Sequence, residues 1–225
     1  RHNDGCQRQV PVADSQAYHP NPGRGQALPA GQIEEGSMKK NVIITTDSVC
    51  DMPPDLLDRY QVRMIPLTIN EGDHSYKDGV DITPDDIYDI YDRQNLLPKT
   101  SAISPQEFTD FFTPLVADGN EVVHIDISAA CSATYQNACM AASELEGVYP
   151  VDSLHLTVGQ GLLVIEACRL RDEGLSAREI AAQLPAYRDK IVTSFVVDTL
   201  EFLWKGGRCS GLTAFGANLL QVRPC

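Results

Sequence analysis

Small hydroxyl and carboxylate side chains recur at the positions where this 225-residue chain is expected to end a strand. In open parallel sheets, ligands bind at the carboxyl ends of the strands. Hydroxyl groups, together with the amide groups of helix N-termini, suit the oxygens of a carboxylate or phosphate. The alternative at each position is a simple helix cap. The residues are Asp47 and Ser48 after the run 42–46, Ser128 after 121–127, and Asp152 and Ser153 after 148–151.

Further candidates for chemistry lie between these positions. Thr100 and Ser101 are expected in a loop before a helix. A serine nucleophile at Ser128 or Ser132 would need a general base, and the sequence identifies none. Cys131, which follows two alanines, is expected to be packed rather than reactive.

Two other features have a functional and a structural interpretation. His124 lies inside an apolar run, so a core or ladder histidine is favoured over a catalytic base. Residues 205–208 (Lys-Gly-Gly-Arg) combine two cations with a relaxed backbone, which suits an anion or partner contact. The structural alternative is a helix C-terminus, where glycine and basic residues are both favoured.

Composition excludes several classes of protein. The chain has 18 Lys and Arg against 31 Asp and Glu, a net charge of −13, which argues against binding to nucleic acid or to an anionic membrane surface. No apolar run approaches the roughly 20 residues that span a bilayer, so no stable membrane insertion is expected. Seven cysteines without a C-x-x-C pair indicate reduced thiols, hence a cytoplasmic protein without a structural zinc site. The common nucleotide-binding, zincin and hydrolase motifs are absent, and no metal or cofactor is predicted.

The pattern of elements predicts an α/β fold. Short apolar runs alternate with helical segments that begin at caps such as Thr83-Pro84, Ser104-Pro105 and Ser176. Such alternation predicts a parallel sheet with helices on both faces. The expected strands are 42–46, 62–69 with a bulge or an edge at Pro66, 121–127, 148–151 and 191–197, and a polar loop is expected over 71–81.

The chain divides into three predicted regions. Residues 1–37 are rich in glycine and proline and poor in aliphatic residues, so a disordered or tag-like leader is expected. Residues 41–190 are expected to form an α/β lobe, and residues 191–225 the beginning of a second, incomplete lobe.

From about residue 41 to its end the chain resembles the DegV family, bacterial fatty-acid-binding proteins that include the binding subunits of fatty acid kinase. Seven separated motifs in family order carry the resemblance. They are T-D-S (46–48), I-P-L (65–67), K-T-S (99–101), S-A-A-C-S-A-T-Y (128–135), D-S (152–153), L-W-K-G-G-R (203–208) and N-L-L (218–220).

The resemblance implies a two-lobed α/β protein that holds one long-chain acyl tail in an internal tunnel. It implies that Thr100 and Ser132 hold the carboxylate, with Ser101, Ser128, Asp47 and Ser48 close by. Family members are not enzymes alone: the bound fatty acid is presented to an ATP-dependent kinase subunit, which forms an acyl phosphate for phospholipid synthesis. Arg208 is suited to the mouth of the tunnel, where the partner or a phosphate would approach.

Three departures from the family pattern stand out. Ala133 follows the second serine of the hydroxyl motif, where the family usually has glycine, and residues 129–131 are less polar than usual. The chain also ends at Cys225, where family members continue, so a fragment lacking part of the second lobe is expected.

Two other functions stay open on the sequence alone. One is a hydrolase or acyltransferase that uses Ser132 or Ser128 as its nucleophile. The other is a binder of a different amphipathic carboxylate, such as a retinoid or a sterol acid.

Overall fold

A four-stranded parallel sheet is the centre of the fold. The computed structural model describes residues 40–197 and 199–208. The order in the sheet is β2-β1-β6-β7, and neighbouring strands pair in parallel throughout. The α/β class is therefore confirmed. The strands are β1 (Val42–Asp47), β2 (Arg63–Ile65), β6 (Glu121–Asp126) and β7 (Val148–Asp152).

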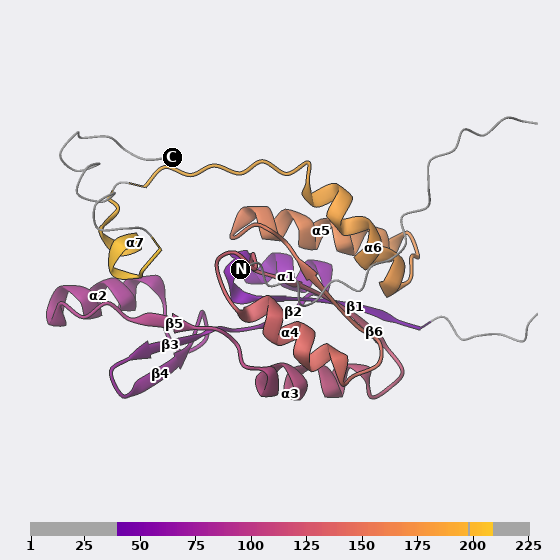
Figure 1. Cartoon of the computed structure of the whole chain (residues 1–225), viewed down its shortest axis with the longest axis horizontal. Helices are drawn as coiled ribbons and strands as arrows, with labels where there is room; N and C mark the ends of the chain where they lie inside the picture. Colours follow the sequence, from indigo (N-terminus) through magenta and orange to yellow (C-terminus); the bar gives the residue numbers. More distant parts are fainter. Residues whose placement is uncertain (1–39, 198, 209–225) are drawn as a thin grey trace, which may run out of the picture. The chain divides into compact units, whose positions relative to one another are not determined.

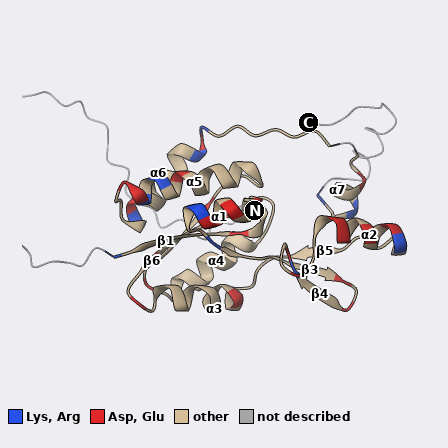
Figure 2. Ribbon diagram, turned by 180° about the vertical axis from the view of Figure 1, so that it is seen from behind, with Lys and Arg blue, Asp and Glu red and all other residues tan. Residues whose placement is uncertain are grey.

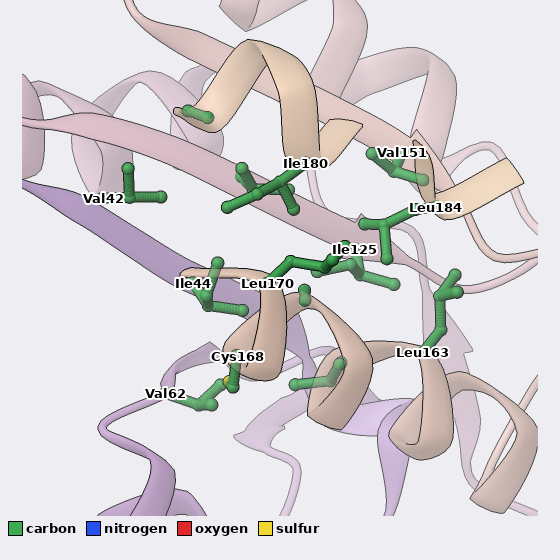
Figure 3. Packing of buried hydrophobic residues seen from close by; sticks show 14 of the residues in the cluster. Val42, Ile44, Val62, Ile125, Val151, Leu163, Cys168, Leu170, Ile180 and Leu184 are labelled. Atoms are coloured by element: carbon green, nitrogen blue, oxygen red, sulfur yellow. The ribbon is translucent and has the colours of Figure 1, made fainter. Parts of the chain in front are cut away.

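Helices cover both faces of this sheet, and each face has its own apolar core (Figure 1). Alternation along β6 divides its side chains, because Val123 and Ile125 face one core and Val122 faces the other. In the first core, sheet residues such as Ile44 and Ile125 pack against α5 and α6 (Figure 3). The first face carries α1 (Pro54–Tyr60), α5 (Val158–Asp172) and α6 (Ala177–Arg188), and the second carries α3 (Pro105–Val116) and α4 (Thr134–Ser143).

A second, antiparallel sheet corrects three sequence predictions. The predicted strand 62–69 is two strands in different sheets, because Pro66 has no N–H to continue a ladder. The predicted polar loop 71–81 contains a strand, and residues 99–101, expected in a loop, form another. This sheet has the order β4-β3-β5. Its strands are β3 (Thr68–Glu71), β4 (His74–Lys77) and β5 (Lys99–Ser101), and α2 (Pro84–Gln94) lies between β4 and β5 in the chain.

Three of the predicted helix starts are capping boxes. The hydroxyls of Thr83, Ser104 and Ser176 each accept a hydrogen bond from the backbone N–H three residues later, and the acidic side chain there bonds back. Two backbone N–H groups of each helix start, which have no partner within the helix, are thus hydrogen-bonded. Each capping box contributes about 1 kcal/mol to the stability of its helix. A short 3-10 helix, η1 (Ser48–Cys50), follows β1 directly.

Residues 191–197 do not form the predicted strand. They are extended but unpaired in the described part of the chain, and Val192 and Val196 are exposed. β-branched residues favour a strand only when a neighbouring strand supplies hydrogen bonds. The leader 1–37 lies outside the described residues, and the boundary between lobes at 190–191 remains a prediction.

The helix α7 (Glu201–Lys205) contacts α2 through polar and aromatic groups. The Tyr91 hydroxyl donates a hydrogen bond to Glu201, 2.7 Å away, and Lys205 lies over the Tyr91 ring. Phe202 packs edge-on against Tyr88 and Tyr91. Charged residues of both signs lie on α1, α2 and α6 (Figure 2).

We predict that Leu163→Ala lowers the free energy of unfolding by about 2–5 kcal/mol, because it leaves a cavity in the first core. Leu163 is fully buried on α5, whereas its neighbour Leu162 is 46% exposed. Leu162→Ala is the matched control and should change stability by about 0.5 kcal/mol or less. Urea unfolding followed by circular dichroism measures both, and equal losses for the two variants would contradict the described packing.

Candidate functional site

The Asp47 carboxylate joins three segments at the carboxyl edge of the parallel sheet. Its Oδ1 accepts from the backbone N–H of Val49 at 2.9 Å, and its Oδ2 accepts from that of Ile127 at 2.7 Å. Gln160 of α5 also donates to Oδ1, at 3.0 Å. Asp47 thus caps η1, as the helix-cap alternative predicted. It also fixes the start of the serine-bearing loop that follows β6.

Ser48 connects the two sheets. Its hydroxyl donates to Asp78 Oδ2 at 2.6 Å and accepts from the backbone N–H of Leu67 at 3.1 Å. Leu67 immediately precedes β3, and Asp78 immediately follows β4. Ser48 therefore orients the antiparallel sheet, which carries Thr100 and Ser101, relative to the edge of the parallel sheet.

The loop 128–133 holds Ser128 and Ser132 in a tight turn. The Ser132 N–H donates to the Ser128 carbonyl, and the Ser128 hydroxyl accepts from the N–H of Ala130. Ser132 Oγ accepts from the N–H of Thr134, 3.2 Å away, and lies 2.8 Å from the Thr134 hydroxyl. If Thr134 supplies the proton of that second bond, the Ser132 hydroxyl keeps its own proton to donate to a ligand.

Thr100 and Ser101 point to opposite faces of β5. Ser101 Oγ accepts from Asn70 at 2.6 Å. Thr100 lies directly opposite Ile69, is exposed, and its hydroxyl makes no hydrogen bond to another described residue. The Thr100 hydroxyl is therefore available to a ligand.

The structure connects the Thr100 and Ser132 segments indirectly. Asn137 of α4, the helix that follows Ser132, donates to the carbonyl of Ile103 at 2.7 Å. Ile103 lies just beyond β5 and packs in the second core. Within the described residues no hydrogen bond joins Thr100 to Ser132, so their shared role as a carboxylate site remains a prediction.

Arg208 lies at the C-terminal end of α7. Gly207 has a φ of +78°, its N–H donates to the Trp204 carbonyl, and the Arg208 N–H donates to the Leu203 carbonyl. These two bonds form a Schellman motif, in which glycine supplies the left-handed residue. Residues 205–208 therefore form a helix C-terminus, which was the structural alternative to an anion or partner contact. The Arg208 side chain is exposed and bonds only the Gly206 carbonyl among described residues, and a partner contact there is untested.

The described geometry offers the serine-nucleophile alternative no base. The described hydrogen bonds of the Ser128 and Ser132 hydroxyls go to Thr134 and to backbone groups, and none goes to a histidine ring. Cys131, expected to be packed, is exposed because the turn directs it outward. Among the described residues, no three His, Cys, Asp or Glu side chains are grouped to hold a metal ion, and no helix there could span a bilayer.

Three buried polar side chains beside this edge are hydrogen-bonded to one another, and the sequence did not predict this arrangement. His124 is fully buried, as predicted for a core histidine. Its Nδ1 lies 2.8 Å from Thr45 Oγ1, and its Nε2 lies 3.0 Å from Asp126 Oδ1. We call Thr45, His124 and Asp126 the buried relay. The available signal was the i, i+2 spacing of His124 and Asp126, which places both on one face of β6.

Three phenylalanines enclose the ring of His124. The rings of Phe108 and Phe112 each lie 5.1 Å from the imidazole in edge-to-face geometry, and Phe111 lies 6.4 Å away. All three members of the buried relay have no exposed surface, so no substrate reaches them. The relay is therefore not a catalytic triad, despite its order of hydroxyl, imidazole and carboxylate.

Burial raises the pKa of two carboxyl groups at this edge. Loss of solvation raises the pKa of Asp126 from 3.8 to about 6, opposed by His124 and reinforced by Asp47 and Asp152. Burial also raises the pKa of Asp47, opposed first by the Ile127 N–H and then by Gln160. Both carboxylates lie near the loop that would receive an anion.

The fold is that of an α/β protein with hydroxyl-bearing loops at its strand ends, and comparison with known proteins identifies its family. Residues 41–225 match the profile of a family described as "Uncharacterised protein, DegV family". A DegV domain-containing protein of Clostridium acetobutylicum is 36% identical over 186 residues, covering 82% of this chain and 67% of that protein. The chain belongs to the DegV family.

Solved structures of related proteins show the same fold. A DegV family protein from Thermus thermophilus, described for its fatty acid binding, has a TM-score of 0.74 and 36% identity over 82% of this chain and 66% of that chain. A stearic-acid-binding protein from Eubacterium ventriosum has a TM-score of 0.65 and 32% identity over 75% of this chain and 60% of that chain. This chain spans about two thirds of the length of the curated relatives it matches.

We predict that Asp126→Asn removes a pH dependence of stability. The folded chain binds the Asp126 proton more tightly than the unfolded chain does, because the folded pKa is about 6. The stability from this group is therefore present below about pH 4 and is lost as the pH rises through about 6. The shift corresponds to about 2–3 kcal/mol at 1.4 kcal/mol for each pH unit.

Urea unfolding at a series of pH values from 4 to 8 measures this difference. The free energy of unfolding of the unmodified chain should fall relative to that of Asp126→Asn across this range. Asp118→Asn, which removes an exposed carboxylate, is the control and should follow the unmodified chain. Parallel curves for the unmodified chain and Asp126→Asn would contradict the raised pKa.

Proposed function

We propose that this chain binds a long-chain fatty acid in an internal tunnel, with the carboxylate held by the hydroxyls of Thr100 and Ser132. The observation that carries the proposal is family membership, together with solved relatives described as binding fatty acids at up to 36% identity. Those proteins are longer than this chain, so the tunnel is proposed for the whole fold rather than for the described residues.

The local geometry supports the two hydroxyls as carboxylate ligands. Thr100 has a hydroxyl without a partner among the described residues, and Ser132 has a proton to donate when Thr134 bonds to it. Ser132 also lies two residues before α4, whose N-terminal amides favour a negative charge. Ser101 and Ser128 would line the same site, with Asp47 and Ser48 holding its loops in place.

The acyl tail would supply most of the affinity. Burying hydrocarbon contributes about 0.8 kcal/mol for each methylene group, so a long acyl chain needs only weak binding of its carboxylate. A carboxylate held by neutral hydroxyls keeps more nucleophilic character than one bound bidentately by arginine. That property suits a head group that must attack a γ-phosphoryl group.

The proposal extends to a partner. The chain would act in the cytoplasm as a non-catalytic subunit that presents the carboxylate to an ATP-dependent fatty acid kinase. The product would be an acyl phosphate for phospholipid synthesis. The exposed Arg208 at the end of α7 would contact the kinase or the transferred phosphate.

We predict that Thr100→Val weakens fatty-acid binding by about 1–3 kcal/mol, because a buried anion loses a hydrogen-bond donor. Titration of the chain with a fluorescent fatty acid measures the dissociation constant. Thr113→Val, on the exposed face of α3, is the matched control and should leave it unchanged.

An unchanged dissociation constant in Thr100→Val would overturn the assigned head-group site. Mass spectrometry of the ligand that co-purifies with the chain separates a fatty acid from a retinoid or a sterol acid. Turnover of a chromogenic ester, abolished by Ser132→Ala, would instead support the serine hydrolase or acyltransferase.

We predict that Arg208→Ala leaves fatty-acid affinity unchanged and slows phosphorylation by the kinase at least about tenfold, since the side chain would act only on the partner or the phosphate. The assay measures acyl phosphate formation with the kinase subunit and ATP. Arg93→Ala, on the exposed surface of α2, is the control for loss of a surface cation. Loss of fatty-acid binding in Arg208→Ala would move this residue into the pocket.

A further inference from the structure

Three aspartates end neighbouring strands at the edge where the head group would bind. Asp126 pairs in register with Asp152 on β7, and Asp47 ends β1 one step beyond the pair Thr46–Ile125. Adjacent strands lie about 4.8 Å apart, so the three side chains start close together. An anion in the loop 128–133 would therefore bring a fourth negative charge to this edge.

Within the described residues no lysine or arginine forms a salt bridge with any of the three carboxylates. Arg188 donates from Nη1 to the backbone carbonyl of Asp152, 2.9 Å away, rather than to its carboxylate. Asp47 is held by backbone N–H groups and by Gln160, and Asp152 accepts from the N–H groups of Ala129 and Leu154. The Asp126 carboxylate bonds only to the His124 ring among the described residues, and its Oδ2 is buried without a partner. A buried carboxylate with a single hydrogen bond is poorly solvated, which favours the addition of a proton.

The buried relay can accept that proton without moving any non-hydrogen atom of its side chains. When His124 is neutral and Asp126 is ionised, Nε2–H donates to Asp126 and the Thr45 hydroxyl donates to Nδ1. When one proton is added, Asp126 carries a proton on Oδ1 and donates it to Nε2, while the single proton of the neutral His124 ring lies on Nδ1 and is donated to Thr45. The Thr45 hydroxyl then turns its proton to the Val123 carbonyl, 3.4 Å away.

We propose that binding of the fatty-acid carboxylate is coupled to the uptake of one proton by the buried relay. The inference rests on the proposed function, and it adds a regulation by pH to that site. One proton enters from solvent with each anion, so the edge gains no net charge. The titratable groups that face Asp126 are His124 on its own strand, Asp47 on β1 and Asp152 on β7. The residues of α3 that pack against the His124 ring are phenylalanines, which carry no charge.

The coupling has a definite sign. An anion near Asp126 increases the proton affinity of the relay, and by reciprocity a proton on the relay increases the affinity for the anion. Fatty-acid affinity is therefore independent of pH while the free relay is already protonated. It falls as the pH rises through the range in which the free relay loses its proton.

Calorimetric titration of the 225-residue chain with oleate tests the proposal. Titrations at pH 7 in phosphate and in Tris, which differ in ionisation enthalpy, give the number of protons taken up. We expect about half a proton or more for each oleate bound, and a dissociation constant that rises about 3- to 10-fold from pH 6 to pH 8. Asp126→Asn should take up almost no proton and change less than about 2-fold over this range.

The control variant Asp118→Asn should behave as the unmodified chain. Oleate binding with no proton uptake by the unmodified chain would overturn the coupling and leave the proposed function intact, and this measurement needs no variant. Equal pH dependence in the unmodified chain and Asp126→Asn would also overturn it. Absence of oleate binding at every pH would overturn the proposed function and the coupling with it, a result distinguishable from the first two.

Discussion

The buried carboxylate of Asp47 is the interaction on which the candidate site depends. It receives hydrogen bonds from the turn after β1, from the loop after β6 and from α5, so a single side chain fixes three segments that are far apart in the sequence. A buried carboxylate is stable only when donors surround it. The donors also need the carboxylate. They are two backbone N–H groups and the Gln160 amide, which would otherwise be buried without an acceptor.

The neighbouring residues of the same motif extend this junction. Thr46 donates to the Ile125 carbonyl and accepts from Gln160, while Ser48 reaches the antiparallel sheet. Three consecutive side chains thus bond to β6, α5 and the β3–β4 hairpin. Such a junction defines where the loops begin, and loops positioned by a rigid sheet are where binding residues are usually found.

Burial explains the unusual electrostatics of this edge. The chain carries a net charge of −13, and charged residues of both signs lie on helices such as α1, α2 and α6 (Figure 2). At the strand ends, by contrast, Asp47 and Asp126 are withdrawn from water and lie beside each other without a described lysine or arginine. If an anion binds at this edge as proposed, its charge would have to be neutralised by a route other than a salt bridge to lysine or arginine, and proton uptake by the His124–Asp126 pair would be such a route.

The sequence by itself determined the fold class, the capped starts of α2, α3 and α6, and the family, because these follow from local periodicity, capping chemistry and ordered motifs. It also identified the strand-end residues Asp47, Ser128 and Asp152. Only the tertiary structure decided that residues 63–71 divide between two sheets and that Thr100 lies on a strand. It also decided that residues 191–197 stay unpaired, and that His124 and Asp126 are joined to Thr45. Those outcomes depend on contacts between segments that are far apart in the sequence. Strand pairing, hydrogen-bond partners and burial arise from these contacts, so no local sequence pattern predicts them.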